Sequence, residues 1–176
     1  MRKKLLVVTL IFFTVLAQAQ ITLFSEDFSQ GSLPSNFTTY DLDGLNPSSL
    51  VANYCNFTGS FVVCQLFGDT FAASPSAFTS PGQADDWMIT PVITLASNNN
   101  SKVLLFDTRS GDPSYLDGVE IYVSTTGNTP QDFLTSTPLY NSTSLGEPVS
   151  WITRSVDLSA YSGQNIYIGF RNNTYN

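Results

Sequence analysis

The chain has 176 residues, of which 7 are basic and 14 are acidic, and its formal net charge at pH 7 is −7. It contains no histidine, which excludes Ser-His-Asp triads, Cys-His dyads and histidine-ligated metal centres. A chain with so few cations also lacks the clustered Lys and Arg that release counterions from nucleic acids, so we expect no nucleic-acid partner.

The N-terminus has the composition of a secretory signal peptide. Residues 2–4 are basic, residues 5–16 are apolar, and the small residues Ala17 and Ala19 follow, as a signal peptidase requires. The apolar run of about a dozen residues is shorter than the roughly 20 that a spanning helix needs, which disfavours the alternative of an uncleaved membrane anchor. We therefore predict a signal peptide over 1–19, cleavage near Ala19, and a secreted or cell-surface protein.

The remaining residues, 20–176, suit one domain with a sizeable core. They are rich in Thr, Val, Ile, Phe and Tyr, and no stretch shows a convincing 3.6-residue apolar period or the length of a transmembrane segment. Loss of the leader leaves four basic against fourteen acidic residues, a net charge of −10, which fits divalent cations or simply solubility outside the cell. The composition predicts an all-β domain.

Short apolar segments separated by turn residues predict about eight strands, which favours a two-sheet sandwich or a barrel. The Ser-, Pro- and Ala-rich residues 68–83 are predicted to form a long surface loop. In chain order, the predicted strands cover residues 21–28, 37–40, 61–66, 87–95, 102–107, 119–124, 151–158 and 164–171.

The apolar patterns of three segments predict how they lie in the sheets. Pro91 cannot donate to a strand ladder, so its segment is placed at a sheet edge or a bulge. Residues 102–107 are apolar on both faces, which indicates a central strand buried on both sides. Residues 119–124 alternate, so we expect Glu120 and Tyr122 to point outward.

The two cysteines, Cys55 and Cys64, belong to a chain bound for an oxidising compartment. A disulfide is the favoured interpretation, provided that the segment between them folds back as a hairpin. A pair of buried free thiols is the alternative. A zinc site is poorly supported, because there is no histidine and no further cysteine.

Five acidic residues at predicted turns or strand starts are candidate calcium ligands. Calcium takes roughly six to eight oxygen ligands, mostly carboxylates and carbonyls, and Asp41-x-Asp43-Gly44 has the alternate spacing of a calcium loop without the later ligands of an EF-hand. Asp86 could instead be a turn former that bonds backbone amides. The candidate ligands are Glu26, Asp41, Asp43, Asp85 and Asp86.

The other acidic residues do not indicate a glycosidase, which needs two carboxylates about 5 to 9.5 Å apart across a sugar. Glu120 stands alone in its predicted strand, and Glu147 lies in a Gly-Glu-Pro turn, so both are interpreted as solvated surface residues. We therefore predict that the chain is not an enzyme and has no catalytic residues.

Aromatic residues are the candidate contacts for a ligand. Trp87 and Trp151 lie in predicted strands and are expected in the core. Tyr115 and Tyr140 lie in predicted loops, where contact residues are commonly found, and they are the candidate ligand-binding residues.

A series of short motifs runs in order through most of the chain after the leader. They are Glu26-Asp27-Phe28, Asp41-Leu42-Asp43-Gly44, Ala84-Asp85-Asp86-Trp87-Met88-Ile89-Thr90-Pro91, Val123-Ser124-Thr125-Thr126-Gly127-Asn128, Val156-Asp157-Leu158 and Ile168-Gly169-Phe170-Arg171. Together they resemble the cleaved-adhesin, or choice-of-anchor, domains, which include the haemagglutinin/adhesin modules of gingipain-like proteins. The resemblance implies a two-sheet jelly-roll β-sandwich, export to the cell surface, a binding role and structurally bound calcium.

The resemblance ends before the family pattern does. Family members continue past the Gly-Phe-Arg strand into a final strand with an Ile-Asp-Asp-Val type motif, whereas this sequence stops at Asn176. We therefore expect a C-terminally truncated domain with an open sheet edge, which invites pairing with another chain. We also expect no C-terminal sorting domain of the kind that such proteins often carry for type IX secretion.

Two function classes follow from the sequence. The first is an adhesin-like binding module that recognises an extracellular glycan or protein. The second is the accessory binding domain of a larger secreted hydrolase or protease.

Overall fold

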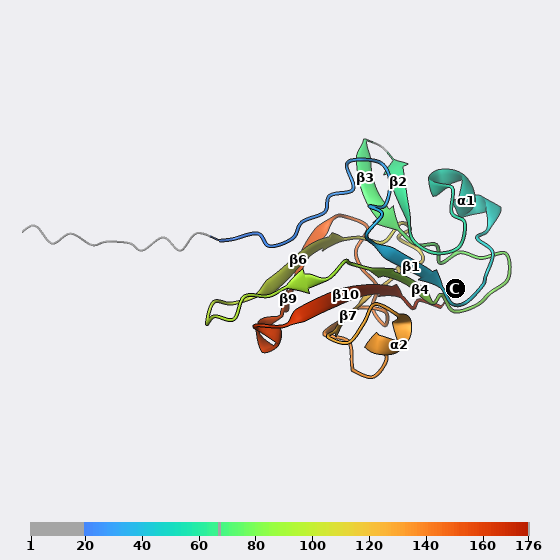
Figure 1. Ribbon diagram of the computed structural model, residues 1–176. Helices are drawn as coiled ribbons and strands as arrows, with labels where there is room; N and C mark the ends of the chain where they lie inside the picture. Colours follow the sequence, from blue (N-terminus) through green and yellow to red (C-terminus); the bar gives the residue numbers. More distant parts are fainter. Residues whose placement is uncertain (1–19, 67, 176) are drawn as a thin grey trace, which may run out of the picture.

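The computed structural model describes residues 20–66 and 68–175, so the predicted signal peptide and its cleavage site near Ala19 lie outside the described residues. All strand pairs are antiparallel, and the elements are labelled in Figure 1. The elements are β1 (Thr38–Asp41), α1 (Ser49–Cys55), β2 (Val62–Leu66), β3 (Asp69–Ala73), β4 (Asp86–Ile89), β5 (Ile93–Thr94), β6 (Val103–Thr108), β7 (Glu120–Ser124), α2 (Pro130–Phe133), β8 (Tyr140–Asn141), β9 (Ile152–Asp157), a 3-10 turn (Ser159–Tyr161) and β10 (Asn165–Asn172).

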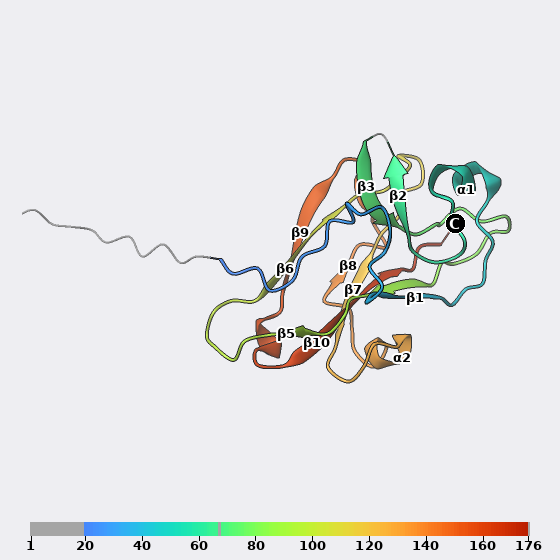
Figure 2. The ribbon, with the colours of Figure 1, turned by 45° about the horizontal axis from the view of Figure 1, so that its top comes forward.

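Two sheets face each other across an apolar core. The larger has the order β1-β4-β10-β7-β8, with β5 pairing with the start of β10, and the smaller consists of β6 and β9. Figure 2 shows β5 beside β10 and β8 beside β7. Alternate apolar residues of β7 and β10 pack against Val156 and Leu158, and Leu104 and Phe106 join them from β6. This arrangement confirms the predicted all-β, two-sheet sandwich.

The opposite face of the larger sheet is also covered, which corrects the expectation that Glu120 and Tyr122 point to solvent. Both are only 5% exposed, because Tyr122 packs with Trp87 and the α2 residue Phe133 in a second core. At Gly169 an added Cβ would lie 3.1 Å from the Trp87 ring, so the strand needs glycine there to admit the aromatic rings.

Helix α2 is fixed at its start by a capping box. The Thr129 amide and hydroxyl donate to Asp132 Oδ2 at 3.0 and 2.6 Å, and Pro130 occupies the first turn. Both helices are too short to show a helical apolar period, so the sequence pattern predicts neither of them.

A two-stranded hairpin, β2–β3, stands beside the sandwich and is tied to α1 (Figure 1). Its second strand occupies residues 69–73, so the prediction of one long surface loop over 68–83 is wrong in its first part. The strand forms there because Thr70 and Phe71 favour extended backbone and pair with Gln65 and Cys64.

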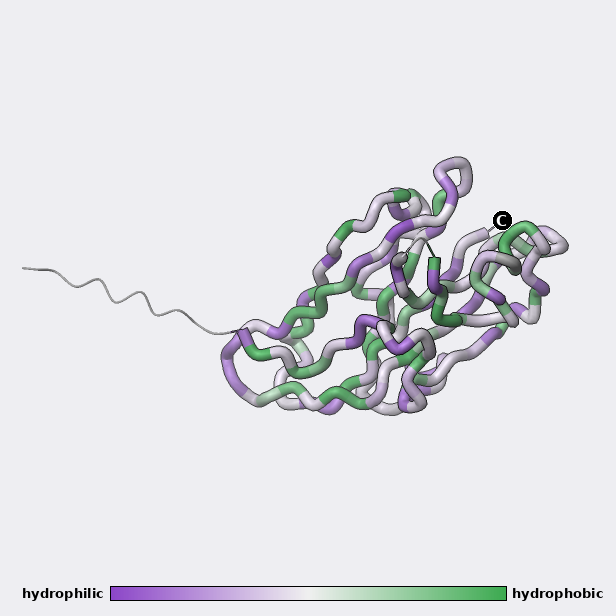
Figure 3. The backbone as a smooth tube through the Cα atoms, turned by 90° about the horizontal axis from the view of Figure 1, so that it is seen from above, coloured by the Kyte–Doolittle hydropathy of each residue, from purple (hydrophilic) through white to green (hydrophobic). Residues whose placement is uncertain are grey.

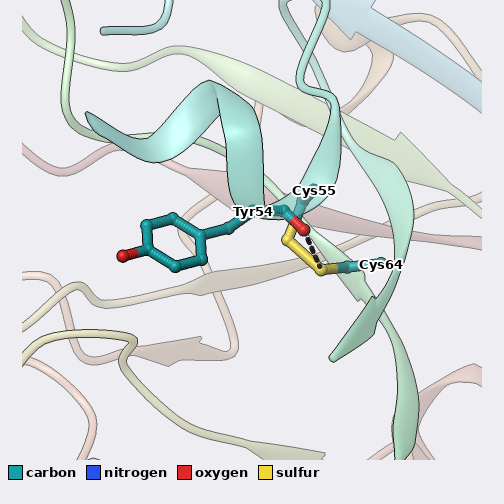
Figure 4. Close-up of a disulfide and its surroundings, with 3 residues drawn as sticks. All are labelled: Tyr54, Cys55 and Cys64. Atoms are coloured by element: carbon teal, nitrogen blue, oxygen red, sulfur yellow. Dashed lines mark hydrogen bonds between the residues drawn. A yellow bond between two sulfur atoms is a disulfide. The ribbon is translucent and has the colours of Figure 1, made fainter. Parts of the chain in front are cut away.

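A disulfide joins Cys55, the last residue of α1, to Cys64 in β2 (Figure 4). Cys64 is only 1% exposed. Its Sγ also lies 3.8 Å from the carbonyl oxygen of Tyr54, whose ring points away from the bond. The bond therefore anchors an exposed helix to the hairpin.

Replacing both cysteines by alanine is expected to lower the free energy of unfolding by about 2–3 kcal/mol, because the bond closes a short loop in the unfolded chain. Urea denaturation of the double variant, compared with the parent under non-reducing conditions, measures the change. An unchanged midpoint would show that the α1–β2 unit does not take part in the cooperative transition.

The predicted strand over residues 21–28 is absent, and this segment lies as irregular chain. The rings of Phe24 and Phe28 pack against Phe37, with centroids 6.0 and 6.2 Å apart, while Ile21 stays 76% exposed. Phe28 has a left-handed backbone with φ of 57°, which a strand does not accommodate.

Two further expectations about strands are wrong. Strand β6 is not buried on both sides: Val103 and Leu105 are more than half exposed, and β9 is its one strand neighbour within the described residues. Trp151 precedes β9 and is 41% exposed rather than in the core, whereas Trp87 is fully buried as predicted.

Pro91 lies between β4 and β5, so it neither forms a bulge nor places β4 at a sheet edge. The chain is divided into β4 and β5, and β4 lies inside the sheet between β1 and β10. Figure 3 shows apolar stretches of the backbone running through the body of the molecule and hydrophilic residues at several of its outlying turns. Among the residues that the structure describes, no helix has the length and apolar character needed to cross a membrane.

Candidate metal centre

Three of the five predicted calcium ligands meet where β1 ends and β4 begins. Asp41 and Asp86 are directly opposite each other in the β1–β4 ladder, and Asp43 follows in the turn after β1. One carboxylate oxygen of each lies within 4.8 Å of the others. Like charges placed opposite each other in a sheet are destabilising, so this cluster, which we call the acidic cluster, carries an electrostatic cost.

Backbone amides hold the two more exposed members in place. Asp41 Oδ1 accepts from the Gly44 amide at 2.8 Å, and Asp43 accepts from the amides of Leu45 at 2.6 Å and Asp85 at 2.7 Å. The spacing Asp-x-Asp-Gly thus builds a turn whose carboxylates are preoriented.

Gly59 closes the acidic cluster from the side. An added Cβ there would lie 2.5 Å from Asp41 Oδ2, and the residue has a φ of +129°, a backbone conformation that side-chain-bearing residues rarely adopt. Glycine therefore allows the main chain to approach the carboxylate closely.

Asp86 is the buried member of the acidic cluster, at 1% exposed. Its Oδ2 accepts a 2.6 Å hydrogen bond from Ser74, but its Oδ1 is buried and has no partner. Burial, aided by the charges of Asp43, Asp41 and Asp85, raises the pKa of Asp86 to about 7. A buried, unpaired carboxylate oxygen beside two further carboxylates is the environment that a hard cation neutralises.

The raised pKa of Asp86 predicts an unusual pH dependence in calcium-free buffer. Between pH 5 and 7 the native state keeps a proton that the unfolded chain has lost, so the free energy of unfolding should fall by about 2–3 kcal/mol as the pH rises. Burial raises the pKa of Asp117 too, which adds to the same trend.

Urea denaturation of the parent and of Asp86→Asn, in chelator at pH 5 and pH 7, isolates the contribution of Asp86. The parent should lose more stability than the variant as the pH rises. Equal losses in the two proteins would show that Asp86 titrates normally.

The two other predicted ligands have different partners. Glu26 accepts a 2.6 Å hydrogen bond from the Phe28 amide and is not part of the acidic cluster. Asp85 Oδ1 accepts from Arg171 Nε at 2.7 Å and from the Trp87 indole at 2.8 Å. Asp85 therefore serves an ion-pair network on the α2 side of the sheet.

That network is centred on Arg171. Its Nη1 donates at 3.0 Å to Glu120 Oε2, and its Cζ lies 5.3 Å from the centroid of the Trp87 ring. Tyr122 and Asn141 also donate to Glu120, at 3.2 and 2.8 Å. The expectation that Glu120 is a solvated surface residue is wrong, because three side chains around it satisfy a buried carboxylate.

Glu147, also expected at the surface, is 1% exposed. Burial alone would raise its pKa, but hydrogen bonds from Tyr140, Ser142 and Arg154 outweigh it and hold the pKa below its usual value. Tyr140 donates at 2.5 Å and Arg154 at 2.9 Å. Tyr140 lies in β8, not in a loop, and its hydroxyl is committed to this interior contact.

Tyr115 keeps the exposure expected of a ligand contact, at 69%. Sequence reasoning missed Ser74 and Asn172, which support Asp86: the Asn172 amide donates to Ser74 Oγ at 3.0 Å, and Ser74 donates to Asp86. No sequence motif marks either residue, since strand pairing alone brings Asn172 opposite Asp86.

Comparison with known proteins gives one family throughout. A family model described as the Cleaved Adhesin Domain matches residues 21–176. Two curated relatives, both Hemagglutinin A of Porphyromonas gingivalis (one from strain W83), are each 28% identical over 164 residues. Each match covers 84% of this chain but only 7% and 6% of the relatives, so the chain spans less than a tenth of their length.

Solved structures show the same fold. The K3 cleaved adhesin domain of Lys-gingipain from Porphyromonas gingivalis W83 superposes with a TM-score of 0.63 at 20% identity, over 87% of this chain and 91% of that one. The K1 domain of the same protein gives a TM-score of 0.56 at 24% identity, over 86% and 88% of the two chains.

Proposed function

The chain belongs to the cleaved adhesin domain family, and on that premise we propose that it is an extracellular, adhesin-like binding module that recognises a glycan or a protein. The family match over residues 21–176 carries this proposal. The relatives are haemagglutinins, and adhesion by such modules requires a binding surface rather than a catalytic centre.

The buried carboxylates favour binding over catalysis. Glu120 and Glu147 are each held by an arginine and a tyrosine, so neither is free to transfer protons to a substrate. A second candidate function, the accessory domain of a larger secreted hydrolase or protease, is favoured by the neighbouring structures, which are domains of Lys-gingipain.

We further propose that the acidic cluster binds calcium as a structural ion. Asp41, Asp43 and Asp86 would supply carboxylate oxygens, and the unpartnered Asp86 Oδ1 is the observation that supports a cation there. A bound divalent ion would remove the repulsion between Asp41 and Asp86 and fix the β1–β4 corner.

A plate assay tests the binding function. Residues 20–176, purified and tagged, are applied to immobilised matrix proteins, erythrocyte membranes and neutral and acidic glycans, with an unrelated acidic β-sandwich as the control for non-specific adhesion. Saturable binding to at least one surface is expected. Binding no stronger than that of the control on every surface would contradict the proposal.

A further inference from the structure

An exposed cluster of aromatic and charged side chains lies between the β2–β3 hairpin and the start of β9. Trp151, 41% exposed, meets Phe71 of β3 edge to face with ring centroids 5.4 Å apart. Arg109, just after β6, places its Cζ 4.9 Å from the Trp151 centroid and 5.3 Å from that of Phe71. Three segments far apart in sequence therefore converge on one surface.

Asp69 fixes the orientation of the exposed indole. Its Oδ2 accepts a 3.2 Å hydrogen bond from Trp151 Nε1, and its own position in β3 is set by pairing with Leu66. Packing with Phe71 and Arg109 restrains the ring further. A large apolar ring held rigidly at the surface loses little freedom when a ligand covers it, which favours binding.

Arg109 is the arginine left without a carboxylate within the described residues. Arg154 pairs with Glu147, and Arg171 pairs with Asp85 and Glu120, but no hydrogen bond or ion pair of the Arg109 guanidinium occurs in the described part of the chain. Its N–H donors are held in place by two aromatic rings and remain available to a ligand.

We infer that Trp151, Arg109 and Asp69 form a platform for a neutral pyranose, with the C–H face of the sugar over the Trp151 indole. This inference rests on the proposed binding function and names its ligand class. Arg109 donates to sugar hydroxyl oxygens, and Oδ1 of Asp69 accepts from a hydroxyl. An amphipathic ring with polar groups at its rim matches this mixture of apolar and polar surface.

Charge favours a neutral sugar over an acidic one. The single guanidinium is accompanied by Asp69 and by Asp107, which lies two residues before Arg109 and is exposed. The whole chain also carries a net charge of −7. An anionic glycan would approach against this field.

Trp151 allows a direct optical test, because the chain has two tryptophans and Trp87 is fully buried. Acrylamide quenching of the parent therefore reports mainly Trp151. Neutral oligosaccharides of glucose, mannose, galactose, xylose and N-acetylglucosamine are each titrated at millimolar concentration. At least one should protect the indole from quenching and give a saturable dissociation constant by calorimetry.

Variants then assign the binding to the platform. Trp151→Ala should weaken the best oligosaccharide at least about tenfold, and Trp151→Phe should weaken it less because a stacking face remains. Arg109→Gln should weaken it several-fold. Tyr54→Ala, which removes an exposed aromatic ring on α1, is the control and should leave affinity unchanged.

The outcomes separate this inference from the broader function. An oligosaccharide that binds parent and Trp151→Ala equally would overturn the platform while keeping the binding module. Failure of every neutral sugar to bind, with binding to sialylated or uronate oligosaccharides or to a matrix protein instead, would also overturn it. Circular dichroism of each variant confirms that lost affinity is not lost folding.

Discussion

Calcium is expected to raise the melting temperature of residues 20–176 by about 10 °C, and Asp86→Asn is expected to remove most of that rise. An ion bound only by the native state at about a thousand times its dissociation constant adds about 4 kcal/mol, and about 1 kcal/mol shifts the midpoint of a domain of this size by roughly 2–4 °C. The loss arises because Asp86 supplies the buried oxygen that has no protein partner.

The same variant should have the opposite effect in chelator at pH 7.5. Asn removes a buried negative charge beside Asp41 and Asp43, so Asp86→Asn should melt higher than the parent without calcium. Asp27→Asn, at an exposed carboxylate outside the acidic cluster, is the matched control and should keep the full calcium response. If calcium does not change the melting temperature of the parent, the proposed metal centre is contradicted.

Loss of the Arg171 guanidinium is expected to be strongly destabilising. Arg171→Met leaves Glu120 and Asp85 without their cation, and the Glu120 side chain is only 7% exposed. Breaking a buried ion pair by removing one partner costs about 3–5 kcal/mol. Urea denaturation at pH 7 measures the change against the parent.

Two further variants show whether the loss of stability in Arg171→Met comes from the unpaired carboxylates of Glu120 and Asp85. Arg109→Met removes an arginine that has aromatic contacts but no described ion pair, and should cost about 1 kcal/mol or less. Adding Glu120→Gln to Arg171→Met should recover part of the stability. If Arg171→Met proves as mild as Arg109→Met, the network around Glu120 has no net role in stability.

The sequence predicted the sandwich because strand propensity and turn residues act locally. The late strands were placed within a residue or two of β9 and β10, since apolar alternation there reflects one buried face. The same reasoning failed for β7, where the second face is covered by α2 from farther along the chain. Alternation cannot distinguish a polar residue facing water from Glu120 facing Arg171.

The candidate metal centre could be predicted only in part, because only some of its residues are close together in the sequence. Asp41 and Asp43 belong to one turn, so their proximity is visible in the sequence, but only the β1–β4 register places Asp86 opposite Asp41. Adjacent Asp85 and Asp86 point to opposite faces of the strand, so one joins the acidic cluster and the other joins Arg171. Trp151 was assigned to the core because a tryptophan at a strand start gives no sign of its exposure.

Isothermal titration calorimetry with the best ligand from the plate assay tests the central claim, that this chain acts by binding, most directly. Discrete heats that decline to zero as sites fill are expected, with the ligand recovered chemically unchanged by mass spectrometry. A heat flow that persists in proportion to protein concentration until ligand is consumed, with a new product mass, would show turnover and contradict it.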